Sequence, residues 1–302
     1  MGALTGFPNG ITSFGIPVIG SGSIPVTLGS YYFVDGTNGS DSNSGLSGTT
    51  ALKTIAAAAT VAAANSTILV FPGTYTEAAI TISVAGVRIL AMGTNPKSTV
   101  WTSATDVTSL VIGAQNIEVA GFYFKPPTYT ADATVASIKL SNAGYANIHN
   151  NRFQGQTGSY NAIYSAVANS DDVTIANNDF IYMNTLTSGA AILGVEAGGL
   201  SYSNWSIIGN TFESCVTAVN ICGRVCKVYD NHFGINGITA LGAGAAVCTL
   251  ALDLSGTSSY GNMVHGNYLG GTYSSSLYKV GASGDDWAGN FNIAGITAAN
   301  PV

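Results

Sequence analysis

Two pairs of neighbouring carboxylates are the residues of this 302-residue chain whose spacing best suits chemistry. Asp171 and Asp172 stand directly before a strand-like string that begins at Val173, and Asp285 and Asp286 stand near the end of the chain. Two close carboxylates can ligate a hard cation such as Ca²⁺, or can act as acid and base in glycoside hydrolysis. Aspartate also forms turns at strand entrances. Asp171 and Asp172 are therefore the better catalytic candidate, with a turn as the competing role, and a turn is the favoured role of Asp285 and Asp286.

The cysteines give no metal-binding pattern. Cys215, Cys222, Cys226 and Cys248 lie in one stretch without a C-x-x-C pair, which argues against a zinc site. We expect them to be small apolar residues inside the fold, and we predict neither a metal nor a cofactor.

The composition limits the classes of partner. Only 8% of the residues are charged, and 15 Asp and Glu stand against 9 Lys and Arg, so no basic stripe is present to bind a nucleic-acid backbone. No apolar stretch reaches the 18 or so residues that a membrane helix requires. Since 46% of the residues are hydrophobic, a disordered chain is not expected either.

A short pattern recurs along the second half of the chain. "ANIHNNRF", ending at Phe153, has the same shape as strings that end at Phe180, Phe212, Phe233 and Leu269. Each has Ile or Val five places before its last residue and Asn two places before it, and the asparagines are Asn151, Asn178, Asn210, Asn231 and Asn267. A sixth copy ends at Phe124, with Phe122 in place of Asn. The closing residues are 29, 27, 32, 21 and 36 apart, so a strict phase with elastic spacers predicts a solenoid.

The histidines do not form one column in this repeat. His149 and His265 stand four places before the closing residue and His232 stands one place before it. We expect all three to face the surface rather than to bind a metal.

A right-handed parallel β-helix accounts for both the phase and the spacing. Stacked coils place like residues in columns, and insertions fall in the turns. We predict that the Ile/Val and closing positions point inward, and that the asparagines occupy a left-handed bend and form a hydrogen-bonded ladder, with a simple turn as the alternative. An antiparallel sandwich is the competing architecture, but it does not explain the identity of residues within a column.

A helix is predicted before the repeats, over about residues 50–65. "TTALKTIAAAATVAAAN" has Thr49 or Thr50 as a candidate N-cap, apolar residues in helical register, and Asn65 as a candidate stop. We expect this helix to cover the first coil of the solenoid, because open solenoid ends are edges that favour aggregation.

The region from Tyr32 to Ile82 resembles the opening of proteins in the pectin-lyase-like β-helix superfamily. The resemblance rests on "DGTNGSDSNSG" at Asp35 to Gly45, "KTI" at Lys53 to Ile55 and "ILVFPGTYTE" at Ile68 to Glu77. It continues through the repeats and implies the fold, but it implies no single function, because the superfamily includes lyases, hydrolases, adhesins and virus tailspikes.

The enzyme motifs that this resemblance suggests are incomplete. A pectate lyase of the superfamily uses Arg or Lys as base beside a calcium cluster, yet none of Arg88, Arg152 and Arg224 lies in a matching motif. Polygalacturonase-like enzymes carry Gly-His-Gly and then Arg-x-Lys, but "VHGN" around His265 lacks the first Gly and follows the Arg224 segment. Whether the chain is an enzyme stays open, and a non-enzymatic role is favoured.

The first thirty residues contain no charge. They lack the basic region and continuous apolar core of a signal peptide, and three prolines interrupt any helix. We predict that residues 1–30 form an extended attachment arm and residues 31–302 the β-helix; the arm residues expected to dock on a partner are Phe7, Pro8, Phe14, Ile16, Pro17 and Val18. The alternative is that the segment folds back along its own solenoid.

"FPNGITSFGIP" is similar, over a shorter stretch, to the openings of β-helix virion proteins of tailed phages. This resemblance implies a homotrimer attached through its N-terminal segment. We therefore expect a structural protein of the virion, assembled in the host cytoplasm, and best placed as a capsid decoration or head-surface protein bound to a capsid or other virion protein. The alternatives are a tailspike that depolymerises a host polysaccharide, with Asp171, Asp172 and Glu196 as its carboxylates, and a β-helix that binds a host glycan without cleaving it.

Overall fold

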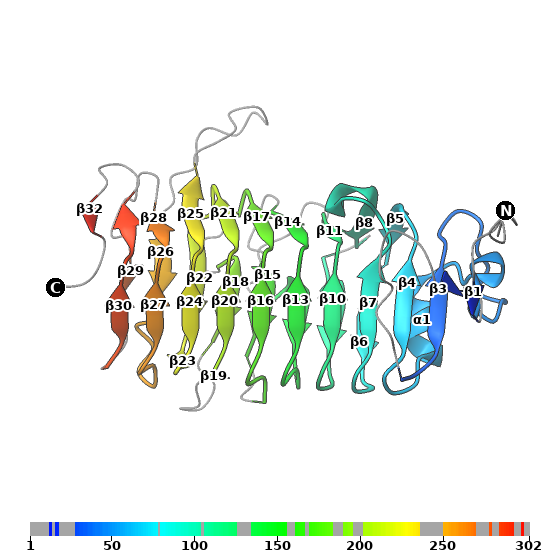
Figure 1. Cartoon of the computed structure of the whole chain (residues 1–302), viewed down its shortest axis with the longest axis horizontal. Coiled ribbons are helices and arrows are strands. Elements are labelled where there is room, and N and C mark those ends of the chain that lie inside the picture. Colours follow the sequence, from blue (N-terminus) through cyan, green and yellow to red (C-terminus); the bar gives the residue numbers. More distant parts are fainter. Residues whose placement is uncertain are drawn as a thin grey trace, which may run out of the picture.

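The computed structural model is a long solenoid of parallel β-strands with the N-terminal and C-terminal coils at opposite ends (Figure 1). It has the predicted architecture of a right-handed parallel β-helix with one short α-helix. The structure describes residues 12–13, 16–17, 28–77, 79–103, 106–125, 134–155, 161–166, 169–183, 190–195, 202–235, 250–269, 278–279, 284–292 and 297–298.

Three long sheets run along the solenoid, and we call them sheets 1, 2 and 3 in the order in which a coil visits them. Sheet 1 contains β3 (Tyr31–Val34), β4 (Thr67–Val70), β7 (Arg88–Ala91), β10 (Glu118–Ala120), β13 (Asn147–His149), β16 (Thr174–Ala176), β20 (Ser206–Ile208), β24 (Lys227–Tyr229), β27 (Met263–His265) and β30 (Asp286–Ala288). Sheet 2 contains β5 (Gly73–Thr76), β8 (Thr99–Thr102), β11 (Tyr123–Phe124), β14 (Arg152–Gln154), β17 (Asp179–Ile181), β21 (Thr211–Glu213), β25 (His232–Ile235), β28 (Tyr268–Leu269), β31 (Phe291–Asn292) and β32 (Thr297–Ala298).

Sheet 3 completes each coil, and two further short strands form a separate two-stranded sheet. Sheet 3 contains β6 (Ile80–Ile82), β9 (Leu110–Ile112), β12 (Ala136–Leu140), β15 (Asn161–Ser165), β18 (Ile192–Gly194), β22 (Thr217–Ile221), β26 (Leu250–Asp253) and β29 (Tyr278–Lys279). The extra pair is β19 (Tyr202–Ser203) with β23 (Gly223–Arg224). Within the three long sheets successive strands are parallel, except that β32 runs antiparallel to β31.

The inward columns are those that the repeat predicts. Ile148 pairs with Ile175 in register, and the same column continues through the later Ile and Val residues, all of them buried. The closing aromatics stack ring on ring: Phe153 and Phe180 have centroids 5.0 Å apart with planes 7° from parallel. The spacing matches the roughly 4.8 Å between strands, so the rings add stacking energy at every coil.

The asparagines of the repeat form a buried ladder at the corner between sheets 1 and 2. Asn178 Oδ1 accepts hydrogen bonds from the backbone N–H of Asn151 at 3.0 Å and from its Nδ2 at 3.2 Å. Asn178 Nδ2 in turn donates to Asn210 Oδ1 at 3.1 Å and to the Ile148 carbonyl at 2.9 Å. The same contacts recur at each coil up to Asn290.

The left-handed bend, however, belongs to the residue before each ladder asparagine, contrary to the expectation. Asn150 and Asn177 have φ of 55° and 54°, and Gly209 has 65°. Asparagine and glycine tolerate this region best. Gly209 also has a steric reason to be glycine, because a Cβ at this position would lie only 2.6 Å from Asn177 Oδ1 of the preceding coil.

The single α-helix in the described part of the chain, α1 (Ile55–Val61), is shorter than the predicted 50–65 and begins later. Its N-cap is Thr54 rather than Thr49 or Thr50, which lie in a 3-10 turn, η1 (Gly48–Thr50). Two groups fix this start. Thr54 Oγ1 accepts from the backbone N–H of Ala57 at 3.0 Å, and the Glu77 carboxylate accepts from those of Ile55 at 2.9 Å and Ala56 at 2.8 Å. α1 packs against β6, the terminal strand of sheet 3, and so covers that edge (Figure 1).

The last described coil keeps the phase of the repeat. Trp287 pairs with Val264, Asn290 extends the ladder, and Asn292 pairs with Leu269 in the closing column.

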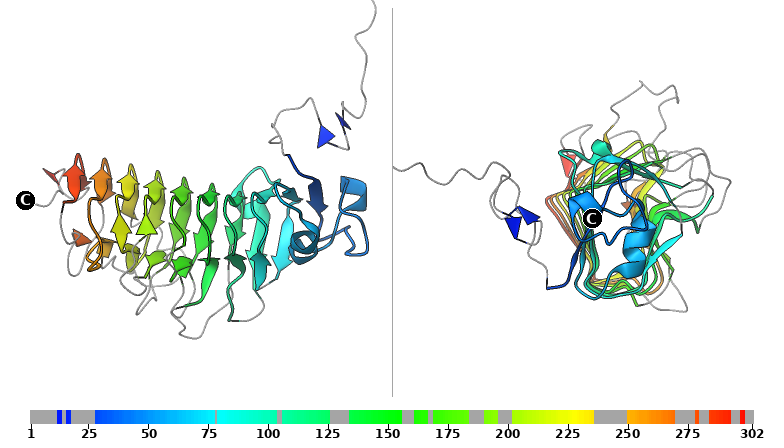
Figure 2. Two further views of the ribbon diagram at one scale, coloured as in Figure 1. Left: turned by 90° about the horizontal axis from the view of Figure 1, so that it is seen from below. Right: turned by 90° about the vertical axis from the view of Figure 1, so that its right-hand side faces the viewer.

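Within the predicted arm, the structure describes two strands, β1 (Thr12–Ser13) and β2 (Ile16–Pro17). They pair antiparallel and only with each other, so this hairpin belongs to none of the three long sheets and lies to one side of them (Figure 2). Phe7, Pro8, Phe14 and Val18 lie outside the described residues.

Candidate functional site

The structure places Asp171 and Asp172 at the turn that leads into sheet 1. Asp171 Oδ1 accepts from the backbone N–H of Ser203 at 2.7 Å, and Asp172 Oδ1 accepts from Asn204 Nδ2 at 2.6 Å. Asp172 also takes the left-handed conformation, with φ of 57°. Both carboxylates therefore join one coil to the next, which is the turn role. They border a cavity of about 360 Å³ that no cationic side chain lines.

Asp285 and Asp286 have different roles, and the favoured turn role is seen for neither: Asp285 bonds to the neighbouring coil and Asp286 begins a strand. Asp285 Oδ1 accepts from the backbone N–H of Asn262 at 2.9 Å. Asp286 begins β30 and lies 2.9 Å from His265 Nε2, on the outer face of sheet 1. The pair thus does not share one site.

Another ionic group on sheet 1 links three successive strands. Glu118 on β10 contacts Arg88 Nε on β7 at 2.5 Å and His149 Nε2 on β13 at 2.9 Å. The hydrogen bond from His149 and those from Arg88 lower the pKa of Glu118 to about 2. This group ties coils together on a flat outer face.

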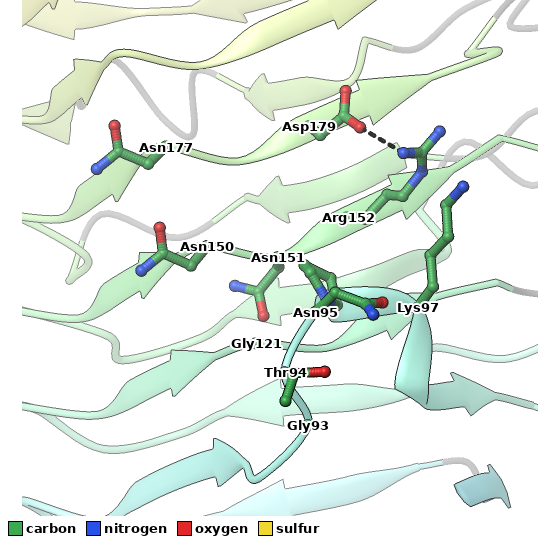
Figure 3. Close-up of a pocket in the computed structure, with 11 residues that line it drawn as sticks. Gly93, Thr94, Asn95, Lys97, Gly121, Asn150, Asn151, Arg152, Asn177 and Asp179 are labelled. Atoms are coloured by element: carbon green, nitrogen blue, oxygen red, sulfur yellow. Dashed lines mark ion pairs between the residues drawn. The ribbon is translucent and has the colours of Figure 1, made fainter. Parts of the chain in front are cut away.

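The densest convergence of charge in the described residues lies on sheet 2. Arg152 on β14 pairs with Asp179 on β17, with Nη1 and Oδ2 2.9 Å apart, and Glu213 follows on β21. Lys97, in the 3-10 turn η2 (Pro96–Ser98), reaches toward the same pair (Figure 3). We call Lys97, Arg152, Asp179 and Glu213 the sheet 2 cluster. It includes two of the nine cationic residues of the chain.

A cavity of about 620 Å³ opens beside this cluster. The η2 segment forms one side and the corner between sheets 1 and 2 forms the other, as Figure 3 shows. Its polar lining includes Thr94, Asn95, Lys97, Asn150, Arg152, Asn177 and Asp179. Sites for small molecules commonly have volumes of roughly 300 to 1,000 Å³.

Burial perturbs the acids of the cluster. Burial raises the pKa of Asp179, while the charges of Arg152 and Lys97 oppose the rise. Burial also raises the pKa of Glu213, and the nearby Asp179 carboxylate raises it further. Glu213 Oε1 and Arg152 Nε are buried and have no hydrogen-bond partner among the described residues. Buried polar atoms of this kind are rare, and they mark positions where a ligand atom or a water can bind.

Arg152 and Asp179 of the cluster belong to a longer row on the outer face of sheet 2. The row consists of the residue directly before each closing position: Tyr123, Arg152, Asp179, Thr211, His232, Tyr268 and Phe291. At its C-terminal end, His232 and Tyr268 have ring centroids 4.8 Å apart, and Tyr268 and Phe291 have theirs 6.1 Å apart. Tyr268 is 44% exposed and Phe291 is 43% exposed.

The row is not among the sites that the sequence predicts. The lyase resemblance raises Arg152 only as a possible base, and no motif points to Asp179, Glu213 or Lys97. The signal was present in the repeat, one place before the closing residue of every copy, whereas Lys97 comes from a segment that precedes the repeats.

Several other expectations concern metals, membranes and cysteines. Within the described residues, no three His, Cys, Asp or Glu side chains come together as a metal site. No helix in the described part of the chain is long and apolar enough to cross a membrane. Cys215 and Cys226 are part of the main core, as expected, and burial raises the pKa of the Cys226 thiol to about 12. Cys248 and Glu196 lie outside the described residues.

No family model matches the sequence, and a search of curated proteins finds no match. Among solved structures, a GH136 lacto-N-biosidase from Eubacterium ramulus has a TM-score of 0.57 at 12% identity, covering 87% of this chain and 56% of that one. A rhamnogalacturonan lyase has a TM-score of 0.46 at 13% identity, covering 90% and 64%. The pectin methyl esterase of rice weevil has a TM-score of 0.44 at 13% identity, covering 80% and 87%.

The chain thus spans less than two thirds of the length of the first two of these structures. At such low identity the likeness concerns the fold. The chain has the pectin-lyase-like right-handed parallel β-helix fold, as the resemblance at Asp35 to Gly45, Lys53 to Ile55 and Ile68 to Glu77 implies.

Proposed function

We propose that this protein is a structural component of a phage virion, best placed as a capsid decoration or head-surface protein. In this proposal residues 1–30 bind a capsid or other virion protein, and the β-helix projects from the particle as part of a homotrimer.

The observation that carries the proposal is a charge-free N-terminal segment whose described strands join none of the three long sheets. The first 30 residues contain no charge, and β1 and β2 pair only with each other, whereas Gly29 and Ser30 hydrogen-bond to the first coil. Apolar residues that join no sheet of the solenoid favour contact with another surface.

The solenoid itself is suited to a durable particle. Its inward columns are fully packed, and the ladder asparagines satisfy the polar groups at each corner. Interactions that repeat from coil to coil favour slow unfolding, so the protein would gain kinetic stability.

Deletion of residues 1–30 tests the attachment role. The truncated chain should keep its β-sheet circular dichroism and should fail to bind particles that lack the protein, whereas the full chain should bind them. A matched control replaces Thr12 and Ser13 with alanine, which leaves the apolar residues in place and should preserve binding. Particle binding by the truncated chain would refute the attachment role of residues 1–30.

A second candidate function is the binding of a glycan, and the sheet 2 cluster with its exposed aromatic row favours it. The similar structure with a TM-score of 0.57 is a lacto-N-biosidase, whose name is that of an enzyme acting on a carbohydrate. A tailspike that cleaves its glycan is the enzymatic form of this candidate.

Released oligosaccharides distinguish the enzymatic form from simple binding. The protein would be incubated with capsular polysaccharide and lipopolysaccharide, and the products would be separated by size. Release that is lost in Asp179→Asn and Glu213→Gln would establish cleavage at sheet 2, release that is lost in Asp171→Asn would assign it to the turn carboxylates, and affinity without release would establish binding alone.

A further inference from the structure

The outer face of sheet 2 combines two features that fit a single ligand. One end of the row of outward residues carries the sheet 2 cluster and the 620 Å³ cavity. The other end carries the rings of His232, Tyr268 and Phe291, which contact one another edge-on and at a tilt. From β11 to β31 the row crosses seven adjacent strands, so it is about 29 Å long at roughly 4.8 Å per step.

The charge of the cavity is opposite to that of the protein. Lys97 and Arg152 line it against a single carboxylate, Asp179, although the chain as a whole has a formal charge of −6. Asp179 occupies Nη1 of Arg152, and the Arg152 and Lys97 side chains both line the cavity. A guanidinium beside an ammonium group favours an anionic group, such as a carboxylate or a phosphate.

The other groups of the cavity suit hydroxyl groups. Asn95 and Asn177 present amides, each able to donate and to accept, and Thr94 adds a hydroxyl. Such groups recognise a molecule with many hydroxyls better than they recognise an apolar surface.

The aromatic end suits flat rings that are partly apolar. Exposed aromatic faces in a line along the solenoid can stack against successive sugar rings, because their apolar faces are available while their edges stay in water. The centre of a protein interface is usually apolar and depleted of charge, whereas this row carries charged residues at one end and aromatic rings at the other.

We propose that the outer face of sheet 2 is a binding track for a linear glycan that carries acidic groups. One acidic group binds in the cavity between Lys97 and Arg152, the neighbouring hydroxyls bond to the asparagine amides, and the chain continues along the solenoid axis to stack on Tyr268 and Phe291. This inference rests on the second candidate function and does not depend on whether the arm binds a particle.

The test uses the purified full-length chain and a panel of acidic capsular polysaccharide fragments. Each carboxylate-bearing fragment is paired with its carboxyl-reduced form, and a poly(glycerol phosphate) represents the phosphate source. Affinity is measured by calorimetry at two salt concentrations. At least one acidic fragment should bind tenfold or more tightly than its reduced form, and the difference should shrink at high salt.

Variants then locate the site. Lys97→Met should weaken binding of the acidic fragment about tenfold and leave the reduced form unchanged, whereas Lys53→Met, which removes an exposed cation elsewhere, should change neither. Tyr268→Ser should weaken both forms equally, and Tyr145→Ser, at an exposed tyrosine on another edge, should weaken neither. Circular dichroism confirms that each variant is folded.

The outcomes separate this inference from the candidate function on which it rests. If no glycan binds at all, both fail. If glycans bind but Lys97→Met and Tyr268→Ser bind as well as the parent chain, glycan binding stands and the track on sheet 2 is refuted. If neutral and acidic forms bind equally, the acidic specificity is refuted. Preferential binding of the poly(glycerol phosphate) would support the anionic site and assign phosphate as its ligand.

Discussion

Replacing Asn178 with leucine tests whether the asparagine ladder stabilises the solenoid. Leucine has a similar size and shape, so the change removes the amide without leaving a large cavity. The backbone N–H of Asn151 loses its acceptor at 3.0 Å, and the carbonyl of Ile148 loses a donor at 2.9 Å. Both groups belong to a corner where Asn151 and Asn178 are almost fully buried.

Two further bonds of the amide are lost, but Asn151 Nδ2 keeps the Val119 carbonyl and Asn210 Oδ1 keeps the backbone N–H of residue 178. The expected loss therefore follows mainly from the Asn151 N–H and the Ile148 carbonyl. A buried donor without a partner costs about 1 to 3 kcal/mol, and a lost hydrogen bond to the carbonyl adds about 1 kcal/mol. The free energy of unfolding should therefore fall by about 2 to 4 kcal/mol, which lowers the ratio of folded to unfolded protein by roughly 30- to 900-fold.

Urea unfolding followed by tryptophan fluorescence measures this loss, and hydrogen exchange reports on the Asn151 amide directly. The matched control is Asn177→Gly, which removes an amide one place earlier at an exposed, left-handed position with φ of 54°. The control should change stability by less than about 0.5 kcal/mol. If Asn178→Leu loses no more than Asn177→Gly, or if the Asn151 amide exchanges no faster, the ladder does not carry the stability assigned to it.

Three further predictions address other columns and groups. Phe180→Ala removes a ring that stacks on both neighbours in the closing column, so the free energy of unfolding should fall by about 3 to 5 kcal/mol in urea; a loss below 1 kcal/mol would contradict the packing. Val225→Gly relieves a β-branched residue at φ of 49°, so it should gain about 0.5 to 1 kcal/mol in the same assay, and a loss would speak against strain. Glu118→Gln should lower the melting temperature at pH 7, and this effect should shrink as the pH falls from 4.5 toward 2. The reason is that the lowered pKa of Glu118 adds stability only while the carboxylate is charged. A difference in melting temperature that does not depend on pH would exclude this linkage.

The columns of the β-helix could be predicted from the sequence because each inward position is constrained by the coils above and below it. Ile148 and Phe153 recur in kind at every copy, and even the divergent Trp287 and Asn290 fall in phase. Periodic identity of this kind survives insertions of any length in the turns.

The location of the bend shows what a local string leaves ambiguous. In "NN", as at Asn177 and Asn178, either residue can take the left-handed conformation, and the prediction placed it at the second. Two copies indicate the correct position, because they have Gly209 and Gly266 directly before the ladder asparagine and glycine is typical of a residue with positive φ.

The start of the helix and the sheet 2 cluster depend on contacts between distant residues. Glu77 caps the N-terminus of α1 from 22 residues away, and nothing in the string around Thr49 shows it. Lys97 likewise meets Arg152 and Asp179 only because the coils stack. Arg152 and Asp179 occupy the same position in successive copies, but their opposite charges hide this from a search for repeated residue types.

The two ends of the solenoid bear on how many molecules can join along one axis. A stack of parallel coils is a growing face that could accept another chain and lengthen into a filament. At one end α1 occupies the edge of sheet 3 with a helix, and at the other β32 runs against the direction of β31, so neither of these edges presents the pattern that a further parallel coil would match. At these two edges the described structure therefore disfavours the end-to-end addition of a second chain, which would otherwise turn a rod of fixed length into a filament.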